Sequence, residues 1–188
     1  MGKNKKLLLI TGDIATGKST FANILSQRYN TNVFFKDSIK EVLGDTIGFS
    51  NREENKKLSN ASMELMYFIF SEFAKLGKSL ILESNFHRVE LEWLQKKALD
   101  NGYEVFTIVL YGETEILHKR YLNRMCNENR HPVHLSTTID NFHDFKKCSE
   151  YLANIEVPGR SIRINTDDFM YQSNEEIIQQ IDKYMLES

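Results

Sequence analysis

The chain has 188 residues, of which 41% are hydrophobic and 27% charged, which is typical of one globular domain with a substantial core. Its 24 Lys and Arg residues are slightly outnumbered by 26 Asp and Glu residues, so the formal net charge is -2. This balance disfavours, without excluding, a protein that holds nucleic acid through an overall basic field.

The amino-terminal sequence MGKNKKLLLITG begins like a signal peptide, but its apolar run stops after four residues. A signal peptide needs roughly 7 to 15 apolar residues and a membrane span about 20. Cys126 and Cys148 lie far apart and outside any CxxC motif, as expected for reduced thiols. We therefore expect a cytoplasmic protein without a membrane segment.

Five apolar runs have the length of β-strands, and segments with helical spacing lie between them. The runs cover residues 7–11, 33–36, 79–82, 105–111 and 161–165. Alternating strands and helices are typical of a parallel sheet covered by helices. The sequence therefore predicts an α/β fold with three layers and a mainly parallel five-stranded sheet, in one domain over residues 1–188.

The first predicted strand runs directly into the sequence GDIATGKST. Between a strand and a helix, the pattern G-x-x-x-x-G-K-S is typical of a phosphate-binding P-loop; an idle glycine turn is the alternative. Backbone amides and the helix dipole favour anions there, Lys18 adds a positive charge, and the Ser19 hydroxyl can bind Mg2+. We expect nucleotide phosphates along the whole loop: Gly12, Asp13, Ile14, Ala15, Thr16, Gly17, Lys18, Ser19 and Thr20. The chain lacks the Asn-Lys-x-Asp motif with which a GTPase reads guanine, so we expect ATP.

The longest predicted helix lies between the second and third strands and has an apolar stripe. The stripe consists of Leu58, Leu65, Ile69, Phe73 and Leu76, widened by Met66 and Phe70. Ser50 and Glu53 have the spacing of a capping box at its start, and Gly77 offers an end. Ser173 and Glu176 have the same spacing before the last helix.

Acidic residues follow three predicted strands, at the sheet edge where ligands bind in open α/β folds. We expect Asp37 on the strand beside the P-loop strand, near the γ-phosphate, where it could orient an acceptor hydroxyl and take its proton. Glu83 has the position of an acid that holds Mg2+. As alternatives, Asp37 caps the following helix, Glu83 is a solvated strand end, and Asp167 opens a turn.

The segment HKRYLNRMCNENRH, residues 118–131, carries four basic side chains of Lys or Arg and one Glu. Arg120 and Arg124 share a helix face, and Arg130 lies beyond them. Arginines on a closing lid can neutralise a transferring phosphoryl group and exclude water; ordinary surface charge is the alternative.

The stretch MCNENRHPVHLS, residues 125–136, is polar and interrupted by Pro132, which predicts a mobile loop. His131 and His134 have no third residue to complete a metal site, so we interpret them as lid or substrate contacts.

These motifs together resemble the small P-loop kinases that include zeta toxin, chloramphenicol phosphotransferase and the kinase domain of phage polynucleotide kinase. The resemblance rests on GDIATGKST, KDSIKEVL, ILESNF, RYLNR, RHPVH and INTDDF, in the order of the family. It implies a lid over residues 118–137. The chain departs from the family pattern at Glu83, where Asp is usual, and at Val133, where glycine is frequent.

The resemblance also implies roles for single residues. Asp37 would be the catalytic base, Lys18 and Ser19 would hold phosphate and Mg2+, and the lid would carry three arginines. Arg124 and Arg130 would act in catalysis and Arg120 and Arg124 on the nucleotide, with the adenine near Asn165, Thr166 and Asp167.

The sequence thus predicts an ATP- and Mg2+-dependent kinase that phosphorylates a hydroxyl of a small molecule. A polynucleotide 5'-hydroxyl kinase, which needs a basic groove with stacking aromatics, is one alternative. A switch that binds ATP without transferring phosphate is another.

Overall fold

The computed structural model describes residues 5–127, 130–135, 139 and 141–186. Residues 128, 129, 136 and 137 of the predicted lid lie outside the described residues.

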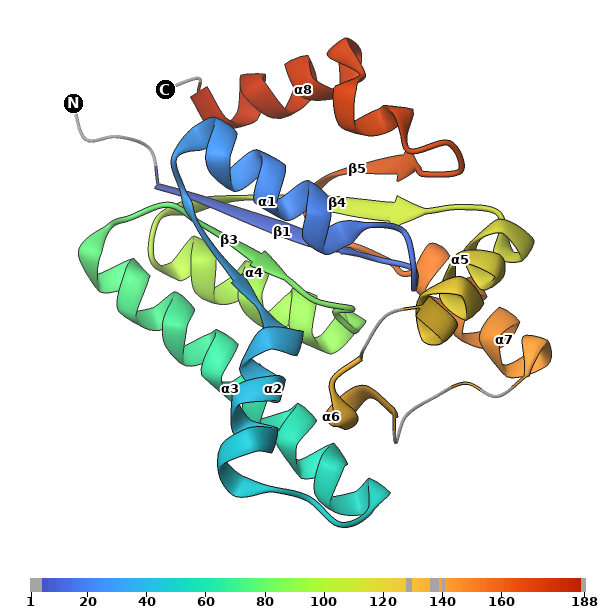
Figure 1. Ribbon diagram of the computed structural model, residues 1–188. Coiled ribbons are helices and arrows are strands. Elements are labelled where there is room, and N and C mark those ends of the chain that lie inside the picture. Colours follow the sequence, from blue (N-terminus) through green and yellow to red (C-terminus); the bar gives the residue numbers. More distant parts are fainter. Residues whose placement is uncertain (1–4, 128–129, 136–138, 140, 187–188) are drawn as a thin grey trace.

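A five-stranded parallel sheet forms the centre of the molecule, with the strand order β2-β3-β1-β4-β5 (Figure 1). The strands are β1 (Lys5–Gly12), β2 (Asn32–Phe35), β3 (Leu80–Glu83), β4 (Tyr103–Tyr111) and β5 (Arg160–Asn165). Each coincides with a predicted apolar run to within two residues. The sequence prediction of the strands and of the fold class is therefore confirmed.

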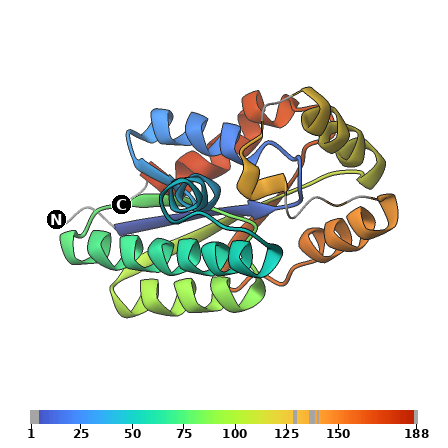
Figure 2. The same cartoon turned by 60° about the horizontal axis from the view of Figure 1, so that its bottom comes forward.

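Helices cover both faces of this sheet. They are α1 (Lys18–Tyr29), α2 (Lys36–Ile47), α3 (Arg52–Leu76), α4 (Arg88–Asp100), α5 (Thr114–Asn127), α6 (Pro132–Leu135), α7 (Phe142–Ala153) and α8 (Glu175–Leu186), with a short 3-10 helix, η1 (Met170–Ser173). Figure 2 shows α1 and α8 on one face and α3 and α4 on the other. None of the helices in the described part of the chain is long and apolar enough to cross a membrane.

Side chains of β1 alternate between two apolar cores, because successive residues of a strand point to opposite faces. Leu7 and Leu9 pack in the core beneath α3 and α4, whereas Leu8 and Ile10 pack in the core beneath α1 and α8. All four side chains are almost fully buried. The central strand is thereby fixed on both faces, and it delivers Gly12 to the carboxyl edge of the sheet.

The structure corrects the expected position of Asp37. We predicted it on a strand beside β1, but β1 pairs with β3 and β4, and β2 pairs only with β3 at the edge of the sheet. Moreover, β2 ends at Phe35 and α2 begins at Lys36, so Asp37 lies in the first turn of a helix.

Both predicted capping boxes are displaced by one residue. Asn51, not Ser50, caps α3 and accepts a hydrogen bond from the Glu54 amide at 2.9 Å. At α8 the Asn174 side chain accepts from the Ile177 amide at 3.2 Å. Asn is as good a cap as Ser, so the Ser–Glu spacing alone did not identify the first residue of either helix.

The predicted stripe of α3 is correct for Leu58, Met66 and Phe70, which are buried, but wrong for Leu65 and Leu76, which are 37% and 67% exposed. An apolar stripe drifts around a long helix. Over the 25 residues of α3, the buried face moves away from those two positions.

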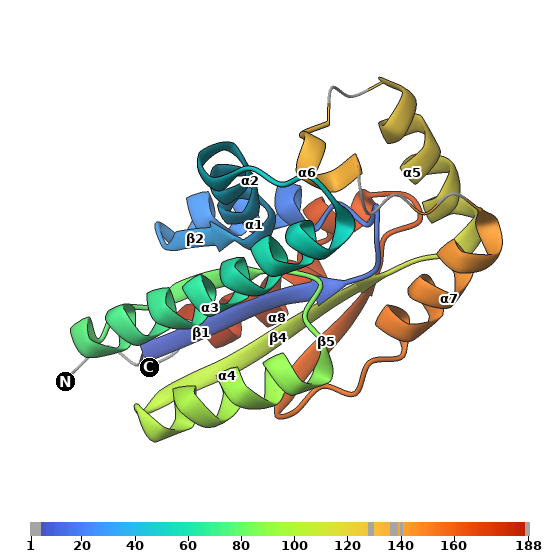
Figure 3. The ribbon, with the colours of Figure 1, turned by 90° about the horizontal axis from the view of Figure 1, so that it is seen from below.

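Residues 125–136 are not simply a loop. Helix α5 continues to Asn127, and Pro132 begins α6, which Figure 3 shows beside α2 and the start of α3. Proline is well tolerated at the first position of a helix, where its missing N–H has no partner to lose.

Candidate active site

The loop between β1 and α1 has the backbone geometry of a phosphate cradle. At Gly12, with φ 125°, an added Cβ would lie 2.0 Å from the Leu110 carbonyl oxygen, so only glycine fits. Gly17, with φ 82°, precedes the first turn of α1 and directs its free amides into the loop. The Asp13 amide ties the loop to β4 through the Leu110 carbonyl at 2.8 Å. This arrangement matches the predicted P-loop.

Lys18 is buried in the cradle, with 8% of its surface exposed. Its Nζ donates to the Asp13 carbonyl oxygen at 2.5 Å. Burial lowers the pKa of the Lys18 ammonium, and the carboxylates of Glu83, Asp13 and Asp37 oppose this shift. A cation held at the loop amides in a poorly solvated place is suited to bind phosphate oxygens.

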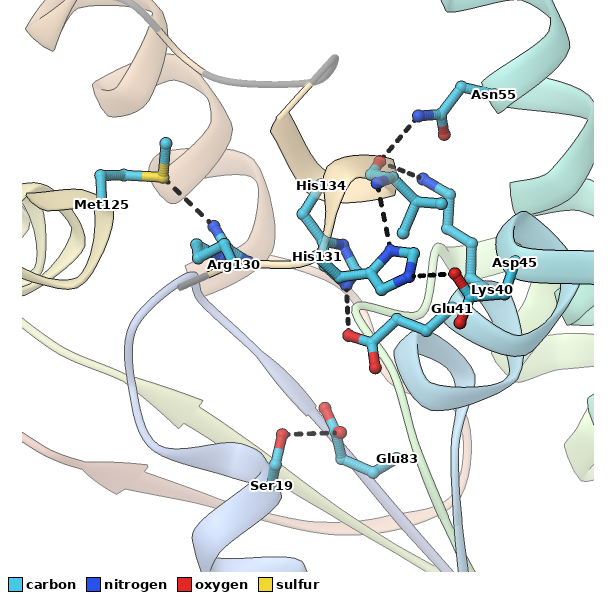
Figure 4. Close-up of polar contacts among 11 residues, drawn as sticks. Ser19, Lys40, Glu41, Asp45, Asn55, Glu83, Met125, Arg130, His131 and His134 are labelled. Carbon is cyan, nitrogen blue, oxygen red and sulfur yellow. Dashed lines mark hydrogen bonds and ion pairs between the residues drawn. The ribbon is translucent and has the colours of Figure 1, made fainter. Parts of the chain in front are cut away.

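Ser19 and Glu83 come together at the ends of neighbouring elements. The Ser19 hydroxyl donates to Glu83 Oε2 at 3.1 Å (Figure 4). Glu83 is buried, and burial raises the pKa of its carboxyl group against the attraction of Lys18. A hydroxyl and a carboxylate beside a phosphate cradle are hard oxygen ligands, so these two residues fit Mg2+.

Asp37 lies exposed in the first turn of α2 and lines the same cleft as Lys18 and Glu83. The residue that precedes α2 is Phe35, in an extended conformation, so the alternative in which Asp37 caps this helix is wrong. Its charge acts on both Lys18 and Glu83. The cleft therefore contains an ionisable carboxylate facing the cradle from a separate element.

The three lid arginines occupy different surroundings. Arg120 donates to the carbonyl oxygens of Thr166, at 2.8 Å, and Asp167, and its guanidinium lies 3.7 Å from the centre of the Phe169 ring. Arg124 is exposed and lines the cleft, where its charge acts on Lys18 and Glu83. Arg130 also lines the cleft, with Nη1 3.4 Å from the Met125 sulfur.

The segment predicted near the adenine is engaged in its own contacts. Asp167 Oδ1 accepts from the Glu113 amide at 2.7 Å, and its Oδ2 accepts from Asn165 at 2.8 Å. Thr166 is buried and donates to the Tyr111 carbonyl oxygen at 3.0 Å. Phe169, which lies two residues beyond this segment, lines the cleft instead.

Helix α6 and the residue that precedes it are bound to α2 by two histidine–carboxylate contacts (Figure 4). His131 Nε2 lies 2.9 Å from Asp45 Oδ1, and His134 Nε2 lies 2.8 Å from Glu41 Oε1. The predicted lid histidines therefore bind the helix that carries Asp37. His134 also lines the cleft.

The centre of this contact is Val133, which is fully buried against α2 and α3. Its carbonyl oxygen accepts from Lys40 Nζ at 3.2 Å and from Asn55 Nδ2 at 2.7 Å. Gly44 leaves room for its side chain, since an added Cβ there would lie 2.3 Å from Val133 Cγ1. Val133, which we noted as a departure from the family pattern, thus occupies a matched space.

All these elements surround one cleft of about 680 Å3. Its lining includes residues that the sequence analysis did not name individually: Lys36, Lys40, Ser59, Ser84, Asn85 and Phe169. Lys36 and Lys40 could have been found, because they flank Asp37 at helical spacing in KDSIKEVL. Six predicted site residues are not among the residues that line the cleft: Gly12, Asp13, Thr16, Asn165, Thr166 and Asp167.

Over residues 1–186 the sequence matches the zeta toxin family. The chain belongs to the zeta toxin family. This confirms the resemblance inferred from the motifs.

Two solved structures share the fold of this zeta toxin family member. A candidate kinase from Chloroflexus aurantiacus is 25% identical in sequence, with a TM-score of 0.81. The match covers 98% of this chain and 100% of the Chloroflexus chain. The tunicamycin resistance protein of Deinococcus radiodurans is 18% identical, with a TM-score of 0.61, covering 98% of each chain.

Among curated proteins, the dephospho-CoA kinase of Borreliella burgdorferi is 28% identical over 137 residues. The match covers 68% of this chain and 62% of that protein, so it spans less than two thirds of the relative.

Proposed function

We propose that this zeta toxin family member is a kinase that transfers the γ-phosphoryl group of ATP to a hydroxyl of a small molecule. One observation carries the proposal: Lys18, the Ser19–Glu83 pair, Asp37 and two lid arginines line a single cleft, although they come from segments far apart in the sequence. The family and the shared kinase-type fold support it. A cytoplasmic setting and a lid over residues 118–137 are part of the same proposal.

Each residue has a task that follows from its position. The P-loop amides and Lys18 hold the phosphates, and Ser19 and Glu83 would hold Mg2+, which neutralises phosphate charge when bound. Asp37, facing the cradle, orients the acceptor hydroxyl and takes its proton as the oxygen bonds to the γ-phosphorus and the bond from that phosphorus to ADP breaks. Arg124 and Arg130 offset the charge that the transferring group spreads over its oxygens.

The family phosphorylates different hydroxyls, so the acceptor must be found by experiment. A screen with ATP labelled in the γ-phosphate against cellular metabolites should give a labelled product with the wild-type protein. Lys18→Ala should bind ATP more weakly and give no product, because the buried cation of the cradle is lost. A switch that only senses ATP would bind the nucleotide but label no metabolite, and that result would contradict the proposal.

A further inference from the structure

The cleft has far more positive charge than the chain as a whole. Among the described residues that line it, six are Lys or Arg and two are Asp or Glu, whereas the chain has a net charge of -2. The proposed roles at the nucleotide account for Lys18 and the three lid arginines. Two lysines on the opposite wall, Lys36 and Lys40, have no task in holding ATP.

These two lysines lie on one face of α2, on either side of Asp37. Lys36 Nζ donates to Ser59 Oγ at 3.0 Å, and Lys40 Nζ donates to the Val133 carbonyl oxygen at 3.2 Å. In the described part of the chain, neither forms an ion pair with a carboxylate within 4.0 Å. Each ammonium has three donors, so both can still bind an anion.

Both positions are unfavourable for a cation. Lys36 is the first residue of α2, where the helix dipole opposes positive charge. Lys40 is only 5% exposed, and burial lowers the pKa of its ammonium, although the Asp37 charge opposes this shift. A bound anion would offset both costs.

A third polar group on the cleft wall is a buried hydroxyl, that of Ser84. Ser84 is 4% exposed, and its Oγ has no hydrogen-bond partner among the residues that the structure describes. It follows Glu83 directly and lines the same cleft as the two lysines. Because an unpaired buried hydroxyl costs free energy, a polar ligand beside it would be stabilised.

We propose that the acceptor is an anionic hydroxy compound, whose carboxylate or phosphate group binds at Lys36 and Lys40 with Ser84 as an additional donor, while its hydroxyl meets Asp37. The inference rests on the proposed kinase function and narrows the class of its acceptor. Neutral sugars and alcohols would give neither ammonium group an ion pair.

Titration of the protein saturated with Mg2+ and the ATP analogue AMPPNP tests the anion site directly. Orthophosphate, acetate and glycerol are the probes. We expect saturable binding of orthophosphate, acetate or both, and none of glycerol. The anion that binds with the higher affinity shows whether the site prefers phosphate or carboxylate.

Matched variants assign the binding to these lysines. Lys36→Met and Lys40→Met should each lower the affinity for the anion at least roughly tenfold, since each removes a charged hydrogen bond. Lys56→Met, the same change at an exposed position of α3 outside the cleft, should have no effect. Lys36 is only half-buried, so its variant keeps the test valid if Lys40→Met fails to fold. Absence of anion binding, or equal binding by all three variants, would overturn the inference.

A second arm examines transfer itself. A metabolite extract is divided on an anion exchanger at neutral pH, and each fraction is incubated with labelled ATP and the protein. The labelled product should form from the retained fraction. Product from the unretained fraction alone would overturn the inference and leave the kinase proposal intact. If neither fraction gives product, the kinase proposal fails, and the titration still decides whether the anion site exists.

Discussion

At the scale of single residues, the site depends on charged groups in unequal surroundings. Lys18 and Glu83 are buried, so burial opposes the ionised form of each and their mutual attraction favours it. Asp37 is exposed and close enough to act on both. A carboxylate that remains accessible to an incoming hydroxyl is better placed to take a proton than one that is enclosed with the metal ligands.

Asp37→Asn tests this assignment. Asn keeps the size and one oxygen but cannot take a proton, so single-turnover transfer to the identified acceptor should fall by about 10²- to 10⁴-fold. Affinity for Mg2+ and AMPPNP and the thermal midpoint should stay near the wild-type values. Full transfer by the variant would remove Asp37 from the mechanism and make Glu83 the next candidate base.

At the scale of elements, α6 connects the lid to the wall that carries Asp37. Its Val133 enters a space that exists only because position 44 has no side chain, and its carbonyl oxygen holds Lys40. Two histidine contacts lie at either side. Loss of this packing should therefore loosen α6 and also change the position of Lys40 on α2, the helix that carries Asp37.

Gly44→Ala should release α6 although alanine is the better residue for helix α2 by about 1 kcal/mol. The added Cβ collides with Val133, and such overpacking costs typically about 1–3 kcal/mol. Hydrogen exchange of the amides in residues 131–134 should become faster. Adding Val133→Ala should restore slow exchange, because it removes the colliding methyl groups. Unchanged exchange in Gly44→Ala would contradict the packing.

Helix α8 is held to α1 by an ion pair between Arg28 and Asp182. Arg28 donates to both carboxylate oxygens of Asp182, at 2.8 and 2.6 Å, and the Tyr29 hydroxyl adds a bond at 2.8 Å. The hydrogen bonds from Arg28 hold the pKa of Asp182 below its usual value of 3.8. The pair is partly exposed, so solvent screens it, and its contribution to the stability of the folded protein is modest.

Asp182→Asn should lower the thermal midpoint at pH 7 by a few degrees. A carboxyl group whose pKa is lower in the folded state than in the unfolded state stabilises the folded protein, and this contribution is complete above the unfolded-state pKa. The contribution is lost as the pH falls through the lower, folded-state pKa. Urea titrations between pH 7 and pH 2.5 should show the difference in stability between the two proteins shrinking as the pH falls below 3.8. A difference independent of pH would mean that the side chain acts through packing.

At the scale of the whole molecule, charge is unevenly distributed. Positive side chains gather in the cleft while the chain is weakly acidic overall, which favours entry of small anions over contact with a long polyanion. A polynucleotide kinase would add a basic groove that extends beyond the phosphate site.

Single-stranded oligonucleotides should therefore bind weakly, with a Kd above about 10⁻⁴ M at physiological salt, the weak end of non-specific binding. The measurement is a fluorescence titration over a salt series. Tight binding that weakens steeply as salt rises would favour the polynucleotide 5'-hydroxyl kinase instead.

The P-loop, the five strands and the family could be predicted from the amino-acid sequence alone. These features depend on contiguous residues: the cradle is made by the backbone of residues 12–20, and each strand is visible as an apolar run. Lys18 and Ser19 were therefore found with their neighbours, and Glu83 was found as the end of a strand.

Contacts between residues far apart in the sequence became visible only in the folded chain. The tertiary structure placed β3 beside β1, which brings Glu83 to Ser19, and it put Asp37 on a helix rather than a strand. It also showed that the segment predicted as a loop contains α6, and that Lys36, Lys40 and Ser84 line the same cleft. Strand order and docking of short helices follow from packing between segments far apart in sequence, and local patterns carry no record of that packing.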